Sequence, residues 1–311
     1  MKTLFLNLIL IWSISTSLIQ TKEQLTPKNC IIAFDLDDTL TKYSPLYKVK
    51  IVGYGLSLNP FKSQESWHYL KALNAMRTLK KKKPLAGNQD ATYPQLIGGA
   101  FLQLTYAGIQ EKNLRPYIKG LIELVWKNAT FKESIPQLLT YLYEQGYELW
   151  IATNKDHVSY TQIVDTLDSN QCFKLAPLIK HSFVVWPKKE ILEKLYTFES
   201  QENSEFQQLI NIIPTVRETA FIHHSHEPKP SNLYYEKMKQ VAKGKKIIFF
   251  DDIKENIAKA KENGILGYRI THPKDIIQQL EKLNILNPTR DQQFYEQLQK
   301  FTFFKKILFW V

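Results

Sequence analysis

Two aspartates stand two positions apart directly after a short apolar run near the start of the chain. The run is Ile31–Phe34, and Asp35 and Asp37 follow it. Such a run is typical of a strand buried on both faces, and the carboxyl end of a buried parallel strand is where open α/β sheets bind ligands. Crowded carboxylates need a cation or a shared proton to relieve their repulsion. The spacing favours such a site over an acidic loop that merely caps a strand.

Three further segments bring polar side chains to a strand end or a helix start. The carboxyl ends of parallel strands lie along one edge of a sheet, so we expect these side chains to share one site with Asp35. They are Thr153 and Asn154 after the predicted strand Tyr147–Ala152, Lys229 at the start of a predicted helix, and Asp251 and Asp252 after the predicted strand Lys246–Phe250, with Asn256 shortly beyond.

Strands and helices alternate along most of the chain, which predicts βαβ units with right-handed crossovers. The predicted fold class is α/β, a Rossmann-like three-layer core with a mainly parallel sheet, plus a mostly helical cap insertion. The remaining strands are expected at His181–Val185, Thr219–Ile222 and Gly267–Ile270, and the helices at Pro136–Gln145, His157–Leu167, Lys229–Gln240, Asn256–Asn263 and Asp291–Val311.

Three breaks in the pattern define the predicted domains. Residues 28–41 and 134–285 form the core. Residues 42–133 lack the alternation of strands and have helical periodicity in places, so we interpret them as the cap over the site. Residues 286–311 form an aromatic C-terminal helix or tail, for which packing on the core is favoured over contact with a membrane.

The first residues resemble an export signal. Lys2 precedes the apolar stretch Leu4–Trp12, and small residues follow at Ser15 and Ser17. This order predicts a signal peptide over residues 1–17 and an exported protein, periplasmic or secreted; the alternative is an N-terminal membrane anchor. In an oxidising compartment Cys30 and Cys172 could form a disulfide, or Cys30 could simply be a buried strand residue.

The composition indicates a folded, basic protein. The chain has 311 residues, 44% of them hydrophobic and 13% aromatic, which excludes a largely disordered chain. Its formal net charge of +11 favours anionic partners without choosing among them. A small phosphorylated substrate is the preferred partner, no nucleic acid is expected, and the aromatic tail leaves room for membrane contact.

The four polar segments, taken in order, resemble the motifs of the haloacid dehalogenase superfamily, which are phosphate-handling hydrolases with an aspartate nucleophile. Asp35-Leu-Asp37-Asp-Thr39 is similar to its first motif, and Thr153 after an apolar strand to its second. Lys229 is similar to the third, and Asp251-Asp252 to the fourth. Each motif alone is weak, but the four in order extend across residues 31–270.

The resemblance implies a Mg²⁺-dependent phosphatase that forms an aspartyl-phosphate. Asp35 would be the nucleophile and Asp37 the general acid and base, while Thr153 and Lys229 would hold the phosphoryl oxygens. The resemblance also implies a Mg²⁺ site, whose ligands would be Asp35, the main-chain carbonyl of Asp37, and Asp251. Thr39 and Asn154 would bind the substrate. Asp252 and Asn256 would orient Lys229 or a metal-bound water.

The carboxylate at Asp37 favours a phosphatase within this resemblance, because displacement of a halide needs no proton and the dehalogenase branch lacks a carboxylate there. The alternative is a catalytically silent protein of the same fold that binds a partner or a membrane. His223, His224 and His226 precede Lys229. We expect them on a loop at the rim of the pocket rather than in a Zn²⁺ or Cu²⁺ site. The substrate class is open, with small molecules favoured.

Overall fold

The computed structural model describes residues 24–43, 128–170, 173–186 and 220–299. Their centre is a six-stranded sheet in the order β6-β5-β4-β1-β7-β8, with every neighbouring pair parallel. The fold is therefore α/β, as predicted. The strands are β1 (Cys30–Phe34), β4 (Glu148–Asp156), β5 (Ile179–Val185), β6 (Ile222–Ser225), β7 (Lys246–Asp251) and β8 (Leu266–Arg269).

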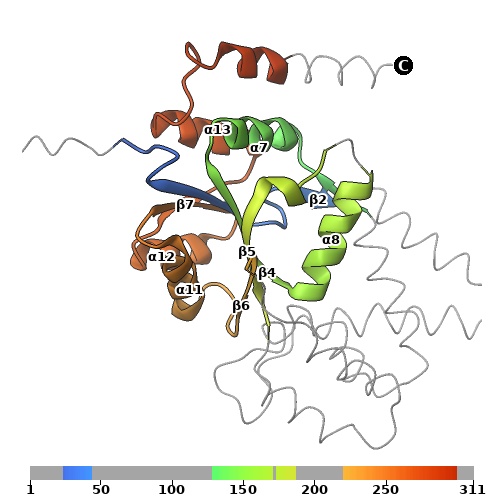
Figure 1. Cartoon of the computed structure of the whole chain (residues 1–311), viewed down its shortest axis with the longest axis vertical. Helices are drawn as coiled ribbons and strands as arrows, with labels where there is room; N and C mark the ends of the chain where they lie inside the picture. Colours follow the sequence, from blue (N-terminus) through green and yellow to red (C-terminus); the bar gives the residue numbers. More distant parts are fainter. Residues whose placement is uncertain (1–23, 44–127, 171–172, 187–219, 300–311) are drawn as a thin grey trace, which may run out of the picture.

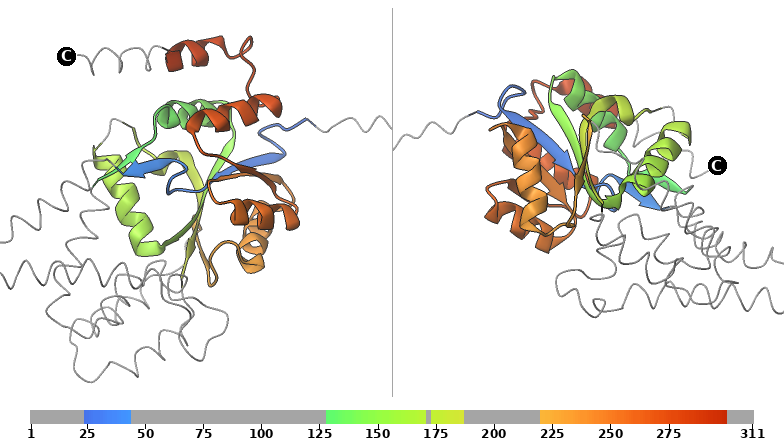
Figure 2. Two further views of the ribbon diagram at one scale, coloured as in Figure 1. Left: turned by 180° about the vertical axis from the view of Figure 1, so that it is seen from behind. Right: turned by 60° about the horizontal axis from the view of Figure 1, so that its bottom comes forward.

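Helices cover both faces of this sheet, which gives three layers (Figures 1 and 2). Alternate residues of each central strand enter opposite cores, as the two-residue period of a strand requires. In β1, for example, Ile32 and Phe34 belong to one core and Ile31 and Ala33 to the other. One face carries α7 (Ile135–Glu144), α8 (His157–Asn170) and α13 (Pro273–Lys282), and the other carries α11 (Asn232–Ala242) and α12 (Lys254–Glu262).

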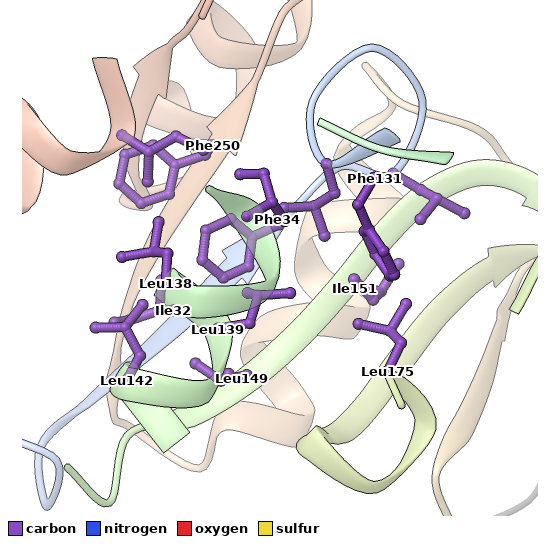
Figure 3. Packing of buried hydrophobic residues seen from close by; sticks show 14 of the residues in the cluster. Ile32, Phe34, Phe131, Leu138, Leu139, Leu142, Leu149, Ile151, Leu175 and Phe250 are labelled. Atoms are coloured by element: carbon purple, nitrogen blue, oxygen red, sulfur yellow. The ribbon is translucent and has the colours of Figure 1, made fainter. Parts of the chain in front are cut away.

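The core under α7 and α8 is the larger one, and Figure 3 shows part of it. Leu138, Leu139 and Leu142 recur at helical spacing on α7 and belong to the same buried cluster as Ile32 and Phe34 of β1. Phe34 of β1 and Phe250 of β7 stack with their ring centroids 5.5 Å apart. Complete burial of these side chains fixes the two central strands side by side, and their carboxyl ends therefore lie together.

The helix α7 begins with Pro136 in its first turn and ends before Gly146, whose φ of +81° suits a residue without a side chain. The helix α11 begins at Asn232 rather than at the predicted Lys229, because Ser231 is its N-cap and accepts a hydrogen bond from the main-chain N–H of Leu233. Lys229 is thus left in the connection before the helix.

Two short antiparallel strands lie outside the main sheet, and the sequence interpretation did not place them. They are β2 (Thr41–Tyr43) and β3 (Ala129–Phe131), and they pair where the predicted cap leaves and rejoins the core. The rest of the predicted cap falls outside the described residues, as do the predicted signal peptide and Cys172. Cys30 is a fully buried residue of β1.

The first residues of the predicted C-terminal segment pack on the core. Leu286 and Phe294 are buried, and Phe294 stacks on Tyr141 of α7 with their ring centroids 4.5 Å apart. Residues 292–299 are helical, and the remainder of the predicted aromatic tail lies outside the described residues. Within the described ranges, no helix is long and apolar enough to span a membrane.

Candidate active site

The chain reverses its direction across the sheet between β1 and β7. From β1 the strands proceed outward through β4, β5 and β6, and the chain then returns to the other side of β1 for β7 and β8. A crevice outside the carboxyl ends of the strands is expected at such a reversal. Asp35 follows β1 and Asp251 ends β7, so both predicted acids lie at this position.

The turn after β1 positions Asp37. The main-chain N–H groups of Leu40 and Thr41 both donate to the carbonyl oxygen of Leu36, at 3.1 and 3.0 Å. Asp38 has a left-handed φ of 54°, which aspartate tolerates better than most residues. The turn breaks the strand alternation, so Asp35 is buried while Asp37 is partly exposed. Asp38, whose side chain is exposed, has a conformational role here.

The ammonium of Lys229 joins the acids of the two central strands. Its Nζ donates to Asp35 Oδ1 and to Asp251 Oδ2, both at 2.7 Å, and to the main-chain oxygen of Ala152 at 2.6 Å. These three bonds use all three ammonium protons. Burial opposes the charge on Lys229, but Asp35 and Asp251 hold its pKa above the usual value. Contact with a phosphoryl oxygen, the predicted role of Lys229, therefore requires one of these bonds to be exchanged.

The site is short of positive charge. Burial raises the pKa of Asp35 to about 7, and the nearby Asp251 and Asp37 add to this, although Lys229 acts in the opposite direction. One ammonium thus faces two buried carboxylates. A further cation at this point would stabilise the charged form of Asp35.

Asp251 has its acceptor positions taken by the protein. Besides Lys229, the main-chain N–H of Ile253 donates to its Oδ1 at 2.8 Å, and the Asn256 amide donates to Oδ1 and Oδ2 at 3.1 and 2.9 Å. Asn256 therefore orients Asp251 rather than Lys229 directly. The next residue, Asp252, is partly exposed, and burial together with the negative charge of Asp251 raises its pKa.

The second predicted motif lies in a bulge of β4. Ala152 pairs with Phe183 of β5, and the next paired residue, Asp156, faces Val185. Three residues, Thr153, Asn154 and Lys155, therefore occupy a stretch in which β5 has only Val184 between the two paired positions. A bulge re-aims side chains that regular alternation would send to opposite faces.

Each residue of the bulge has a different partner. Thr153 is buried, and its Oγ1 accepts a hydrogen bond from the main-chain N–H of Lys155 at 3.1 Å. The Asn154 amide makes a two-point contact with the main chain of Lys229, accepting from its N–H at 2.7 Å and donating to its oxygen at 3.0 Å. This contact sets the position of Lys229, whereas the sequence interpretation gave Asn154 to the substrate.

Lys155 completes the site, and the sequence interpretation missed it. Its Nζ lies 2.7 Å from Asp37 Oδ2, in an ion pair between two partly exposed side chains. A lysine directly after the Thr153-Asn154 pair was the available signal, but the strand pattern gave no reason to direct it toward Asp37. Thr39 Oγ1 is buried without a hydrogen-bond partner among the described residues, which leaves its predicted contact with substrate as a prediction.

Two neighbouring tyrosines of α11 make hydrogen bonds to the main chain of the site, and the sequence analysis did not predict them. Tyr234 OH lies within hydrogen-bond distance of the main-chain oxygens of Thr153, at 3.0 Å, and of Phe183, at 2.8 Å, and its single proton is shared between them. Tyr235 OH donates to the main-chain oxygen of Asn256 at 2.7 Å. Both tyrosines are fully buried, and an apolar-looking helix face gave no sign of these bonds.

Two of the three histidines differ from the prediction of a loop at the rim, whereas His226 lies in the connection after β6. His223 and His224 belong to β6, a strand that begins at Ile222, where the predicted strand ended. His223 Nε2 lies 3.0 Å from His181 Nδ1, and His224 Nε2 lies 2.8 Å from His157 Nδ1. Neighbouring residues of a strand point to opposite faces, so the two imidazoles pair separately. His226 Nδ1 donates to the main-chain oxygen of Trp186 at 2.9 Å.

A Mg²⁺ ion fits the oxygen donors at the carboxyl edge of β1 and β7. In the described ranges, no three His, Cys, Asp or Glu side chains gather closely enough to hold an ion alone. Mg²⁺ keeps several waters and needs only one or two carboxylates from a protein. Asp35 and the main-chain carbonyl of Asp37 are suitable donors. Of the acids Asp251 and Asp252, the first has its acceptor positions occupied and the second is partly exposed.

No family model and no curated protein matches the chain. Several solved structures are similar to it. A HAD family enzyme from Bacteroides thetaiotaomicron, in complex with magnesium and inorganic phosphate, has 13% identity and a TM-score of 0.41, covering 78% of this chain and 93% of its own. The HAD-hydrolase YfnB from Bacillus subtilis, bound to magnesium, has 13% identity and a TM-score of 0.40, with coverages of 82% and 99%.

A third similar structure, the L-2-haloacid dehalogenase from Xanthobacter autotrophicus, has 10% identity and a TM-score of 0.42, with 86% of each chain covered. These similarities assign no role to a residue of the present chain. Its parallel sheet brings Asp35, Lys229 and Asp251 into contact and places Thr153 in the adjoining bulge. In the order of its motifs and in the sheet that carries them, the chain resembles the haloacid dehalogenase superfamily.

Proposed function

We propose that this protein is a Mg²⁺-dependent phosphatase that hydrolyses a phosphate monoester through an aspartyl-phosphate on Asp35. The observation that carries the proposal is the grouping of three functional side chains at the reversal between β1 and β7. A buried carboxylate, Asp35, accepts from the ammonium of Lys229, and a second carboxylate, Asp37, follows it on the same turn. A nucleophile, a cation and a proton carrier are the parts that phosphoryl transfer requires.

The reaction proceeds in two steps. Asp35 Oδ attacks phosphorus, the bond from phosphorus to the ester oxygen breaks, and Asp37 gives a proton to the departing oxygen. A water then attacks phosphorus, Asp37 takes its proton, and the bond from phosphorus to Asp35 breaks to release phosphate. Thr153 and Lys229 stabilise the equatorial oxygens in both steps. When bound, Mg²⁺ supplies the positive charge that lets an anionic nucleophile approach a phosphate.

Asp37 favours phosphate ester hydrolysis over displacement of a halide. A departing halide needs no proton, whereas a departing alkoxide does. The carboxylate of Asp37 is partly exposed, so a leaving group could reach it. A protein that only binds a partner would have no need of this carboxylate, of the buried Asp35 and of the bridging Lys229 together.

The nucleophile can be tested with purified protein and p-nitrophenyl phosphate in the presence of Mg²⁺. We expect measurable phosphate release from the wild-type protein and a fall of about a thousandfold or more in kcat for Asp35→Asn, because an amide is a poor nucleophile. Asp38→Asn is the matched control: it changes an exposed carboxylate of the same turn and keeps a residue that tolerates a positive φ.

We expect Asp38→Asn to retain wild-type activity. Undiminished turnover by Asp35→Asn would rule out the assigned nucleophile. If the wild-type protein releases no phosphate from a broad panel of phosphate esters with Mg²⁺, the phosphatase proposal as a whole fails.

A further inference from the structure

The bulge in β4 places a second lysine beside the proton carrier of the proposed reaction. Lys155 Nζ contacts Asp37 Oδ2 at 2.7 Å, and the side chain of Lys155 is 22% exposed. Lys229, by comparison, is 1% exposed and is enclosed by Asp35, Asp251 and Ala152. The two lysines therefore differ in their surroundings, because Lys229 is enclosed by buried acids and Lys155 is partly exposed.

The contact with Asp37 fixes the part of the substrate that Lys155 would meet. Asp37 has to reach the ester oxygen within hydrogen-bond distance in order to protonate it. An ammonium that contacts Asp37 at 2.7 Å would lie close to that ester oxygen as well. Its closest substrate atoms would be those attached to the carbons next to the ester oxygen.

A second ammonium group reaches the same turn. The ammonium of Lys132, which follows β3, donates to the main-chain oxygen of Asp38 on the same turn. Two lysines from separate elements thus reach the turn that carries Asp37. Charge pairing with such ammonium groups steers an acidic ligand and sets its register in the site.

We propose that Lys155 is a specificity-determining residue that binds an acidic group, a carboxylate or a second phosphate, on the leaving part of the substrate. The proposal rests on the phosphatase function proposed above. It narrows the substrate class to small phosphate monoesters with a second negative group close to the ester oxygen.

The test compares two substrates that differ in one charge. These are 2-phosphoglycolate, which has a carboxylate next to the ester carbon, and 2-hydroxyethyl phosphate, which has a neutral hydroxymethyl group in its place. The ratio of their kcat/KM values is measured in the wild-type protein, Lys155→Met and Lys155→Arg. Lys180→Met is the matched control, because Lys180 pairs with Glu148 at the opposite, amino end of β4.

We expect the wild-type protein to favour 2-phosphoglycolate, and Lys155→Met to reduce the ratio by about tenfold, mainly through KM for the acidic substrate. Lys155→Arg should keep most of the preference, and Lys180→Met all of it. A ratio that Lys155→Met leaves unchanged, whether or not both rates fall, would overturn the inference. So would a wild-type protein that hydrolyses both esters equally, whereas absence of turnover on any phosphate ester would overturn the proposed function and this inference with it.

Discussion

At the scale of single residues, the two adjacent acids at the end of β7 have different surroundings. Asp251 is completely buried and receives hydrogen bonds from Lys229, Ile253 and Asn256. Asp252 is partly exposed, and its pKa is raised by burial and by the charge of Asp251. We infer that Asp251 holds the lysine in place while Asp252 contributes to Mg²⁺ binding. The resemblance alone had given the metal to Asp251.

Matched amide substitutions can separate these two roles. Asp252→Asn should weaken the apparent affinity for Mg²⁺ by about tenfold or more and leave stability nearly unchanged. Asp251→Asn should lower the free energy of unfolding by about 3–5 kcal/mol, because it removes a partner from a buried ion pair. Mg²⁺ titration of phosphate release and urea unfolding without Mg²⁺ measure the two effects. Loss of Mg²⁺ affinity only in Asp251→Asn would restore the original assignment.

Most residues of the candidate site could be predicted from the sequence, but the hydrogen bonds between them could not. Asp35, Lys229 and Asp251 were recognisable because each follows or precedes an apolar segment that has to be buried. The hydrogen bonds between the Asn154 amide and the main chain of Lys229 join residues that are 75 positions apart in the sequence. No local pattern encodes such a contact, because it depends on how the bulge turns a side chain after the sheet has formed.

At the scale of elements, α11 supports the bulge of β4. Tyr234 reaches from this helix to the main-chain oxygens of Thr153 and Phe183, on two neighbouring strands. One hydroxyl thereby fixes the distance between β4 and β5 at the point where their regular pairing is interrupted. The hydrogen bonds of the tyrosine hydroxyl go to main-chain oxygens, so its role in the proposed reaction is one of positioning.

Removing this hydroxyl should affect both stability and substrate binding. Tyr234→Phe should lower the free energy of unfolding by about 1–3 kcal/mol, because buried carbonyl groups lose a donor. It should also raise KM for p-nitrophenyl phosphate several-fold, because Thr153 is less well positioned. The control is Tyr160→Phe, since the Tyr160 hydroxyl is equally buried and contacts Ser182 at 2.6 Å away from the predicted catalytic residues.

Urea unfolding and steady-state kinetics on both variants provide the comparison. Tyr160→Phe should lose stability without a change in KM. A similar KM for the two variants would leave Tyr234 with a purely structural role.

The strands that the sequence failed to predict, or predicted at the wrong residues, have a weak or very short pattern of apolar residues. The strands β2 and β3 have three residues each, Thr-Lys-Tyr and Ala-Thr-Phe, and their existence depends on pairing with each other across the predicted cap. The strand β6 begins at Ile222 instead of ending there, because its histidines find partners on α8 and β5. Long buried strands such as β7 were placed nearly correctly, since burial on both faces leaves an uninterrupted apolar run.

At the scale of the whole molecule, the two ends of the sheet have different electrostatic roles. The carboxyl end holds the acids of the proposed active site. At the amino end Glu148, the first residue of β4, accepts from Lys180 of β5 and from Lys245 just before β7, both at 2.9 Å, and from Trp150 Nε1. Burial acts against the charge on Glu148, but the hydrogen bonds from Lys245, Lys180 and Trp150 outweigh it and lower its pKa to about 2.

This depressed pKa gives a defined dependence of stability on pH. The unfolded chain protonates Glu148 near its usual pKa of 4.5, and the folded protein does so only at about 2. The stabilisation is therefore fully present above pH 4.5 and is lost as the pH falls toward 2. Glu148→Gln should lower the free energy of unfolding by about 1–3 kcal/mol at pH 7, and this difference should disappear through that range.

Urea unfolding at several pH values measures the effect, with Glu262→Gln as the control. Glu262 pairs with Lys259 at 2.8 Å on the surface of α12, so its substitution should change stability by less than about 0.5 kcal/mol. A difference between wild type and Glu148→Gln that stayed constant from pH 7 to pH 2 would contradict the assigned pKa.

The bulge of β4 also limits how this protein can evolve. Thr153, Asn154 and Lys155 are consecutive and have separate partners, and regular pairing with β5 resumes at Asp156. Deletion or insertion of a single residue here would change the direction of all three side chains at once. The hydrogen bonds of Asn154 to Lys229 and the contact of Lys155 with Asp37 would both be lost. Exchange of one side chain for another leaves the other two in place. Diversification at this strand end is therefore open to substitution and closed to insertion or deletion.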